Sequence, residues 1–453
     1  MPPTPHGDPT PPRRTPDTTA PRSPERDATP PSGPDSGAGT TPGGDGSGTK
    51  READPLEPAP QGTDPQAPNP QEPTPEAPAA QAADSQESAP QESAPEATDP
   101  KATDPEATGA GQRGRARKRW VRWVRRGVVV LVLLLLVPLL GAEAALRVNY
   151  SGDPADGTYT RGQDAIWLGH AWVDGRKTDA DVTALAERLR GTGIRDLYVH
   201  TGPLEHDGTL PESVYSKAGW FIAAVHRALP GVRVQAWLGD VLASESPDGL
   251  RLERARTRAA VVASAREVLA AGYEGAHFDL EPLHSGDRNY LGLLDDLRAV
   301  TRAHGALLSV ASHQIDPLPA FHSVWGTLTN HPKWWSQAYF GEVARRVDQI
   351  AVMSYDTMQP LQSLYGGYVA QQTSLALEVT PPGTRLLMGL PFYHENKFGH
   401  QAHAETVPAA VRGVRLGLSR TDADRARFGV ALYVDFAATE ADWTAYREDW
   451  VHR

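Results

Sequence analysis

Apolar runs and helical patterns alternate from Asp164 to the end of the chain. Short apolar runs bounded by turn residues are typical of buried strands, and the longer segments between them are typical of helices. The runs expected as strands are 165–173, 195–201, 232–239, 275–281, 306–312, 348–355, 385–393 and 428–436. The segments expected as helices are 178–190, which opens with a Thr-x-x-Asp start, 216–229, 251–271, 289–304, 334–347, 367–379, 406–418 and 439–451.

The number of these units predicts the fold class, which is α/β. Eight strand–helix units in about 290 residues match a closed (β/α)₈ TIM barrel in both count and length, and we assign residues 160–453 to it. The alternative is a doubly wound open sheet. That architecture usually has fewer strands and often carries a Gly-rich phosphate turn, which this sequence lacks.

The first 112 residues show neither pattern. No aromatic residue precedes Trp120, Leu56 is the only Leu, Ile or Val before it, and 26 of the 41 prolines lie in the first 110 residues. Such a segment has no apolar surface to bury and cannot offset its chain entropy. We therefore expect residues 1–112 to be a disordered tail rich in Pro, Ala and acidic residues.

A basic segment and an apolar run follow the tail. Residues 113–126 carry Arg113, Arg115, Arg117, Lys118, Arg119, Arg122, Arg125 and Arg126. The run 127–146 contains one acidic residue, Glu143, and has about the twenty residues that a membrane-crossing helix needs. Basic residues before the run place the N-terminus in the cytoplasm, and Trp120 and Trp123 suit the interface. The basic segment should also favour anionic lipid.

These features predict a single-pass protein of the cell membrane with its C-terminal domain outside the cytoplasm. A signal peptide is the alternative, because Ala142-Glu143-Ala144 resembles a cleavage site with small residues. The long tail in front favours a signal anchor. In either case the barrel is expected to be extracytoplasmic.

Charge and composition exclude several classes of function. The net charge of −11 argues against a general nucleic-acid binder, and zero cysteines exclude disulfides, thiolate metal sites and a cysteine nucleophile. Histidines on four strands make a metal hydrolase worth considering, but His170 stands alone where such barrels usually open with His-x-His. Gly-x-Ser-x-Gly is absent, so a serine esterase is not supported. We expect neither a metal nor another cofactor.

Three ionisable residues mark the fourth strand as the one that carries chemistry. His277, Asp279 and Glu281 alternate along it, so they share one face, which points into the barrel. The other face carries Ala276, Phe278 and Leu280. Stacked ionisable groups are costly inside a barrel unless they are paired or used, and barrel active sites lie at the C-terminal strand ends. We interpret them as catalytic; the alternative is a buried structural hydrogen-bond network.

The same strand resembles a motif of glycoside hydrolase family 18, the chitinase-like family, which reads D-G-x-D-x-D-x-E. This chain has Glu274-Gly275-Ala276-His277-Phe278-Asp279-Leu280-Glu281. The glycine, the last Asp and the terminal Glu match, Glu274 is a homologous replacement, and His277 departs from the middle Asp.

Three further strands are similar to those of the family. Met353-Ser354-Tyr355-Asp356 resembles M-x-Y-D, and Gly389-Leu390-Pro391-Phe392-Tyr393 resembles G-x-P-x-Y. Gly429-Val430-Ala431-Leu432-Tyr433 resembles the last strand, with Tyr433 in place of the usual Trp. The third strand, which contains Trp237, lacks the usual S-x-G-G.

The resemblance implies retaining hydrolysis of a β-linked N-acetylglucosaminide, in which the acetamido oxygen of the substrate attacks the anomeric carbon. It implies that Glu281 is the general acid and that Asp279, Tyr355 and Asp356 hold the acetamido group. The residues expected to bind the polysaccharide are His277, Trp237, Tyr393 and Tyr433.

Two alternatives remain at this point. One is a barrel that binds sugar without catalysis, although such members typically lose the terminal acid and Glu281 is present. The other is a glycosidase with a different sugar preference and two protein carboxylates. The state of His277 also matters. A neutral ring could hydrogen-bond Asp279, whereas a cationic one would lower the pKa of both carboxyls.

Overall fold

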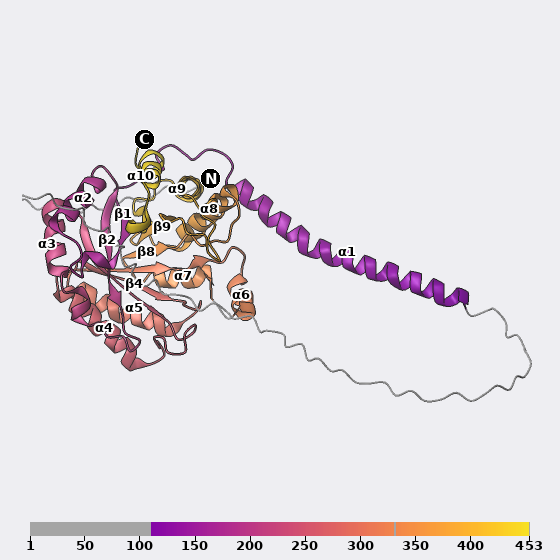
Figure 1. Ribbon diagram of the computed structural model, residues 1–453, viewed down its shortest axis with the longest axis horizontal. Coiled ribbons are helices and arrows are strands. Elements are labelled where there is room, and N and C mark those ends of the chain that lie inside the picture. The colour runs from indigo at the N-terminus through magenta and orange to yellow at the C-terminus, as the bar shows by residue number, and fades with distance from the viewer. Residues whose placement is uncertain (1–109, 330–331, 453) are drawn as a thin grey trace, which may run out of the picture. The chain divides into compact units, whose positions relative to one another are not determined.

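The computed structural model describes residues 110–329 and 332–452 (Figure 1). The tail expected to be disordered lies outside these residues for all but its last three positions.

Eight parallel strands form a closed barrel surrounded by helices (Figure 1). The strands are β1 (Asp164–Leu168), β2 (Ile194–Pro203), β3 (Arg233–Val241), β4 (Gly275–Glu281), β5 (Leu307–Ser312), β8 (Gln349–Val352), β9 (Arg385–Pro391) and β10 (Phe428–Tyr433). Their order around the barrel is β1-β10-β9-β8-β5-β4-β3-β2, and β1 pairs with both β2 and β10. The prediction of a (β/α)₈ barrel is confirmed, and the open sheet is excluded.

Helices connect the strands as the sequence pattern predicts. They are α2 (Asp179–Leu189), α3 (Ala218–Ala228), α4 (Ala255–Ala270), α5 (Arg288–Ala303), α8 (Gln362–Val379), α9 (Val407–Thr421) and α10 (Glu440–Tyr446), which continues into a π-helical turn, η4 (Arg447–Val451). Three short 3₁₀ turns are η1 (His170–Trp172), η2 (Glu212–Tyr215) and η3 (Asp435–Ala437). The expected start of α2 is confirmed, because the Asp181 carboxylate accepts the Thr178 backbone N–H at 2.8 Å and completes a capping box.

The prediction of one helix over residues 334–347 is wrong for its first turn. Trp334–Trp335 form a short strand, β7, paired with β6 (Gln314–Ile315), and the helix α7 (Gln337–Ala344) begins only after them. The indole N–H of Trp334 donates to the Tyr368 hydroxyl at 2.7 Å, and that of Trp335 donates to the Leu283 carbonyl at 2.9 Å. These tertiary bonds outweigh helical propensity, which is a weak determinant. The helix α6 (Phe321–Thr329) was not expected.

Four expected strands also end earlier than their apolar runs. The residues that follow β1, β8, β9 and β10 in these runs are outside the ladder. Several of these residues, such as Trp172, Val173 and Phe392, are buried in the core although they lie outside the ladder, so apolar character alone did not mark the strand ends.

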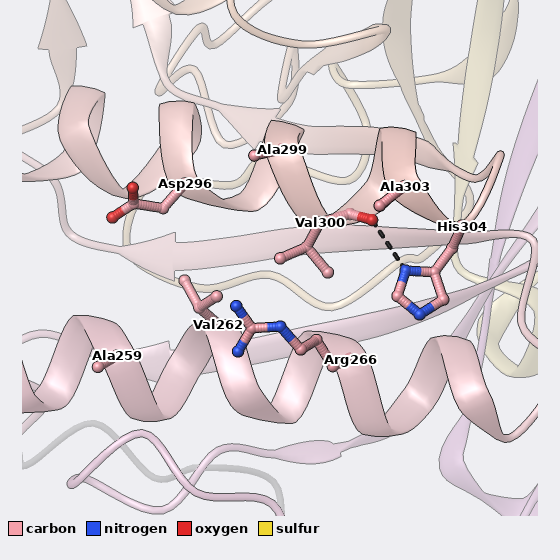
Figure 2. A pocket seen from close by; sticks show the side chains of 8 residues that line it. All are labelled: Ala259, Val262, Arg266, Asp296, Ala299, Val300, Ala303 and His304. Atoms are coloured by element: carbon pink, nitrogen blue, oxygen red, sulfur yellow. Dashed lines mark hydrogen bonds between the residues drawn. The ribbon is translucent and has the colours of Figure 1, made fainter.

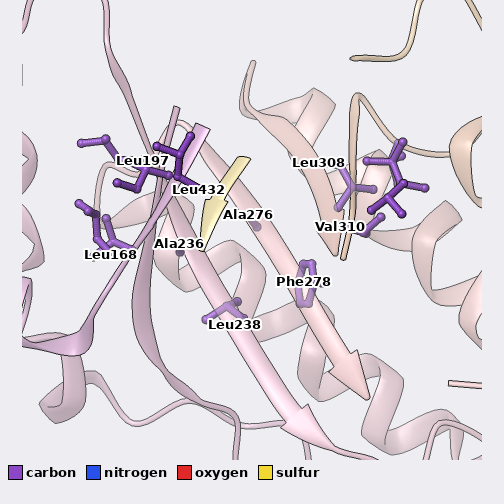
Figure 3. Packing of buried hydrophobic residues seen from close by; sticks show 14 of the residues in the cluster. Leu168, Leu197, Ala236, Leu238, Ala276, Phe278, Leu308, Val310 and Leu432 are labelled. Atoms are coloured by element: carbon purple, nitrogen blue, oxygen red, sulfur yellow. The ribbon is translucent and has the colours of Figure 1, made fainter. Parts of the chain in front are cut away.

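Strand alternation divides the core into two layers. The outer layer lies between strands and helices and includes Leu238 of β3 and Phe278 of β4, which are register partners (Figure 3). The inner layer fills the barrel and contains Ala165, Trp167, Tyr198, Ala351, Leu387 and Ala431. The expected outward face of β4 is confirmed, since Ala276, Phe278 and Leu280 are buried in the outer layer.

A buried carboxylate closes the N-terminal end of the barrel. Asp196 accepts hydrogen bonds from Arg233 at 2.7 and 2.8 Å, from Arg385 at 2.8 Å, from Gln235 at 2.8 Å and from Gln349 at 2.9 Å. Its side chain is fully buried, and two guanidinium groups balance its charge. The network joins strands β2, β3, β8 and β9.

The basic segment and the apolar run form one continuous helix, α1 (Ala110–Asn149). Within residues 120–149, the most apolar window of 18 residues has a mean hydropathy of 2.6, and none of this window is buried. The described basic segment and the apolar run thus share one helix, although their compositions differ. By length and composition α1 can cross a membrane.

The C-terminal end of α1 packs on α8 and is hydrogen-bonded to α9. Arg420 donates to the carbonyls of Asn149 and Ser151 at 2.6 and 2.7 Å. A Cβ atom on Gly367 of α8 would lie 1.9 Å from the carbonyl oxygen of Leu146, so only glycine permits this approach.

Candidate active site

The barrel fold brings seven of the eight expected site residues to one mouth, at the C-terminal ends of its strands. Parallel strands in a closed barrel all end at the same rim, so residues far apart in sequence meet there. The seven are Trp237 of β3, Asp279 and Glu281 of β4, Tyr355 and Asp356 after β8, Tyr393 after β9 and Tyr433 of β10.

Aromatic rings line this mouth. Tyr355 stacks on Tyr433 with the ring centroids 5.1 Å apart and the planes at 19°. Tyr393 lies edge-on to both, at 5.9 and 5.8 Å, and Trp237 lies edge-on to Tyr433 at 6.3 Å. Such faces offer a sugar apolar contact area without requiring hydrogen bonds.

Asp279 presents one bonded and one unbonded carboxylate oxygen. Its Oδ2 accepts the indole N–H of Trp237 at 3.2 Å. Its Oδ1 is buried and has no hydrogen-bond partner among the described residues. Burial raises the pKa of Asp279 to about 6, because desolvation disfavours the charged form.

Glu281 lies two residues further along the same face, at the opening of the mouth. Burial and the negative charges of Asp279 and Asp356 raise its pKa well above the usual range of a glutamate. The side chain still keeps 44% of its area exposed, which gives a substrate access to it. The Nδ1 atom of His313 lies 3.5 Å from its Oε1. Glu281 is therefore a carboxylic acid that retains its proton above the usual range.

The surroundings of Asp356, in contrast to those of Glu281, favour the ionised carboxylate. Its backbone is left-handed, with φ of 55°, and its Oδ1 accepts the Tyr393 hydroxyl and lies 3.1 Å from His400 Nδ1. Its Oδ2 lies 3.3 Å from the ammonium of Lys397. Burial alone would raise the pKa of Asp356, but His400, Lys397 and Tyr393 together lower it. The carboxylate is ionised, and both of its oxygens are occupied.

Four residues around Asp356 were missed by the sequence analysis. His400 is fully buried, and its Nδ1 lies between Asp356 and Glu405, at 3.1 and 3.2 Å. Glu405 also accepts the Thr357 backbone N–H at 2.9 Å. The other two are Lys397 and Lys333, and Lys333 donates to the Asp356 carbonyl. They come from irregular segments outside the motifs, so no periodicity or spacing marked them.

The grouping of Asp356, His400 and Glu405 also meets the spacing of a metal site. One ligand atom from each lies within 4.8 Å of the others. Burial alone would lower the pKa of His400, but the two carboxylates raise it to about 9, so the ring carries a proton at neutral pH. Lys333 and Lys397 add two more positive charges beside Asp356. A cluster of ion pairs fits these residues better than a cation does.

Replacing His400 with Gln should destabilise the protein in a pH-dependent way. Because the pKa of His400 is raised on folding from about 6.5 to about 9, its stabilisation is fully present below the lower value and disappears as pH rises through the higher one. We expect a loss on the order of 3 kcal/mol at pH 6 that vanishes above the folded-state pKa. Thermal unfolding of His400→Gln and the wild type across this range checks it. The exposed His403, changed in the same way, should show no such trend.

The structure places His277 beneath the site, out of reach of a ligand. Its side chain is fully buried and stacks on Tyr198 at 3.8 Å. Its Nε2 accepts the Trp167 N–H at 3.1 Å, and its Nδ1 therefore donates to the Ser309 hydroxyl at 2.8 Å. Burial lowers the pKa of His277 to about 3, so the ring is neutral. The expected contact with substrate, and the alternative hydrogen bond to Asp279, are both incompatible with this arrangement.

A groove on the outer wall of the barrel is separate from this mouth. It lies between α4 and α5, has a volume of about 500 Å³ and contains none of the expected site residues (Figure 2). Small side chains such as Ala259 and Ala299 leave the space, and Arg266 and Asp296 border it (Figure 2). We assign it no role in the chemistry of the mouth.

Comparisons with known proteins give similar structures but no sequence relative. No family model and no curated protein matches the chain. The spore cortex-lytic enzyme SleL of Bacillus cereus is 13% identical, with a TM-score of 0.45 over 64% of this chain and 74% of that one. A chitinase from Chromobacterium violaceum ATCC 12472 is 12% identical, with a TM-score of 0.44 over 64% of this chain and 99% of that one.

A plant class V chitinase mutant from Cycas revoluta, in complex with (GlcNAc)3, is 13% identical, with a TM-score of 0.45 over 63% of this chain and 99% of that one. Similarity at this level does not transfer an activity, since one fold hosts many functions. The case for a function therefore rests on the side chains of the mouth.

Proposed function

We propose that the barrel is a glycoside hydrolase that acts on polysaccharide containing N-acetylglucosamine. The observation that carries this proposal is that two carboxyl groups in one mouth have pKa values shifted in opposite directions. The pKa of Glu281 is raised and that of Asp356 is lowered, so one is an acid and the other an anion under the same conditions. Groups whose pKa values are pushed apart in this way identify acid and base roles.

The arrangement of oxygen atoms favours a substrate-assisted, retaining mechanism. Both oxygens of Asp356 are occupied by Tyr393, His400 and Lys397, so this carboxylate is poorly placed to attack a sugar. The unbonded Oδ1 of Asp279 can instead accept the N–H of a substrate acetamido group. The acetamido oxygen then attacks the anomeric carbon to form an oxazolinium ring, while Glu281 donates its proton to the leaving oxygen.

The second half of the reaction reverses these roles. Glu281, now ionised, takes a proton from water, whose oxygen attacks the anomeric carbon and reopens the ring with net retention. The anions Asp279 and Asp356 stabilise the positive charge of the intermediate. Tyr355, by its place in the resemblance, would hold the acetamido group with Asp356, and the stacked Tyr433 offers the sugar a face.

The two alternatives make different demands on the same residues. A barrel that only binds sugar has no need for a carboxyl group that stays protonated, yet the surroundings of Glu281 keep it so. A glycosidase with two protein carboxylates would need Asp279 as nucleophile and would cleave sugars that lack an acetamido group. Incubation of the detergent-solubilised full chain with labelled glycans, with and without N-acetyl groups, distinguishes all three.

The proposed activity should depend on pH in a bell-shaped way. The active form has Glu281 protonated and Asp279 ionised, and burial raises the pKa of both groups. Rate should fall below about pH 6 as Asp279 takes up a proton, and again above the raised pKa of Glu281. The dependence of kcat/KM on pH measures both limbs. A rate that keeps rising into alkaline pH would contradict Glu281 as the acid.

We propose that α1 anchors the domain in the cell membrane, with the tail in the cytoplasm and the barrel outside. Trp120 and Trp123 are exposed on α1 next to Arg122, and Arg125 and Arg126 precede the apolar run. This order suits an interfacial belt and contact with anionic lipid. Protease added to intact cells should digest the barrel and spare the tail. N-terminal sequencing of the mature chain detects cleavage near Ala144.

A further inference from the structure

The carboxylate of Asp279 has few hydrogen-bond partners. Among the residues that the structure describes, the indole N–H of Trp237 is the hydrogen-bond donor to this carboxylate, at 3.2 Å from Oδ2. The other oxygen, Oδ1, is buried without a partner. A single bond therefore fixes which oxygen is held and which is free.

His277, the neighbour on the same face, cannot share this task. Its Nε2 accepts from Trp167 and its Nδ1 donates to Ser309. The Ser309 hydroxyl then donates to Tyr198 at 3.4 Å, and Tyr198 donates to Gln349 at 3.3 Å.

This series of bonds continues to the far end of the barrel. Gln349 donates to Asp196 at 2.9 Å. Every donor in the series points toward that buried carboxylate, so the tautomer of His277 is fixed and neither ring nitrogen is free to bond Asp279. The donor for Asp279 must come from another strand.

The third strand supplies that donor because of its register. Trp237 pairs with His277, and Gly239 pairs with Asp279. A Cβ atom on Gly239 would lie 3.0 Å from the Asp279 carbonyl oxygen and 3.9 Å from the Trp237 indole nitrogen. Glycine at this position thus leaves the room that the indole and the carboxylate share.

The indole is itself held in place by packing. His200 of β2 lies edge-on to it at 4.8 Å, and Tyr433 lies on its other edge at 6.3 Å. Burial lowers the pKa of His200 to about 4, so no positive charge from this ring competes for Asp279. The negative charge of Asp279 raises the pKa of four neighbouring groups, which are Glu281 of β4, Tyr355 after β8, Tyr433 of β10 and Tyr290 of α5. Asp356, after β8, acts in the same direction on Glu281, Tyr355 and Tyr433.

We propose that Trp237 is the positioning residue of Asp279, rather than a platform for a sugar ring: its N–H holds Oδ2 so that Oδ1 faces the substrate. Indole is a donor and never an acceptor, so it stabilises the ionised carboxylate more than the protonated one. The inference rests on the proposed function for its catalytic meaning. The orientation itself concerns the free protein, so it can be tested without any turnover.

The test replaces Trp237 with Phe in the full chain, with ¹³C-labelled Asp followed by NMR as pH is varied. Loss of the N–H should raise the pKa of Asp279 and shift the acidic limb of the rate profile to higher pH. We expect kcat to fall on the order of 10-fold with KM little changed, which is the loss of one hydrogen bond to a charged group. Benzothienylalanine at position 237 replaces the N–H by sulfur at the same shape and should give the same shift.

Trp172→Phe is the matched control, because the Trp172 N–H donates to Asp435 at 2.9 Å, an equivalent bond, and Trp172 packs in the outer layer against Phe221 of α3. It should leave the pKa of Asp279 unchanged. If Trp237→Phe and the isostere also leave it unchanged, Trp237 does not position Asp279 and the inference is wrong. If Trp237→Phe raises the pKa of Asp279 but the wild type cleaves no glycan, the inference holds and the proposed function is wrong.

Discussion

Replacing Glu281 with Gln should lower turnover by a factor on the order of 10² or more while sugar binding survives. Glutamine keeps the shape and much of the hydrogen bonding of the side chain but has no proton to give. The effect should be large because burial and two other carboxyls raise the pKa of Glu281 well above its usual range, so that this side chain holds a proton to donate. Measured kcat, with glycan affinity from calorimetry, checks both parts.

Asp279→Asn provides the second arm of this experiment. It removes the counter-ion of the developing positive charge and should also damage turnover. The two carboxyls act as a unit, so the double variant should cost much less than the product of the single effects. Glu253→Gln makes the same change at an exposed site and is the control. An active Glu281→Gln protein would remove Glu281 from the acid role.

Replacing Asp196 with Ala should destabilise the barrel by about 3–5 kcal/mol and lower its melting temperature by roughly 5–15 °C. The substitution leaves the guanidinium groups of Arg233 and Arg385 facing each other without their common anion. It also removes an acceptor for Gln235 and Gln349. Breaking a buried ion pair on one side is costly because the remaining charge stays desolvated.

Chemical denaturation of Asp196→Ala and a surface variant separates this effect from ordinary loss of an ion pair. Glu342 forms exposed salt bridges with Arg345 and Arg346, and Glu342→Ala should destabilise the protein far less than Asp196→Ala does. Equal losses in the two variants would show that the Asp196 network contributes no more than a surface pair. Asp196→Asn, which keeps the shape but not the charge, should fall between them.

The alternation along β4 shows how far the sequence alone could go. The positions of Asp279 and Glu281 on one face follow from the two-residue period of a strand, whatever surrounds it. The count of strand–helix units likewise predicts the barrel, and a closed barrel gathers the strand ends. The expectation that Tyr355, Tyr393 and Tyr433 lie near the two carboxyls came instead from the resemblance of their motifs to those of the chitinase-like family.

Tertiary structure decided which partners these residues have. His277 has the correct face but binds Trp167 and Ser309, and strand register, not sequence spacing, places Trp237 beside Asp279. His400 reaches Asp356 from an irregular segment that follows no period. Periodicity reports the direction of a side chain relative to its own strand or helix. The protonation state of a carboxyl group depends on burial and on charges brought from other strands, which only the folded chain supplies.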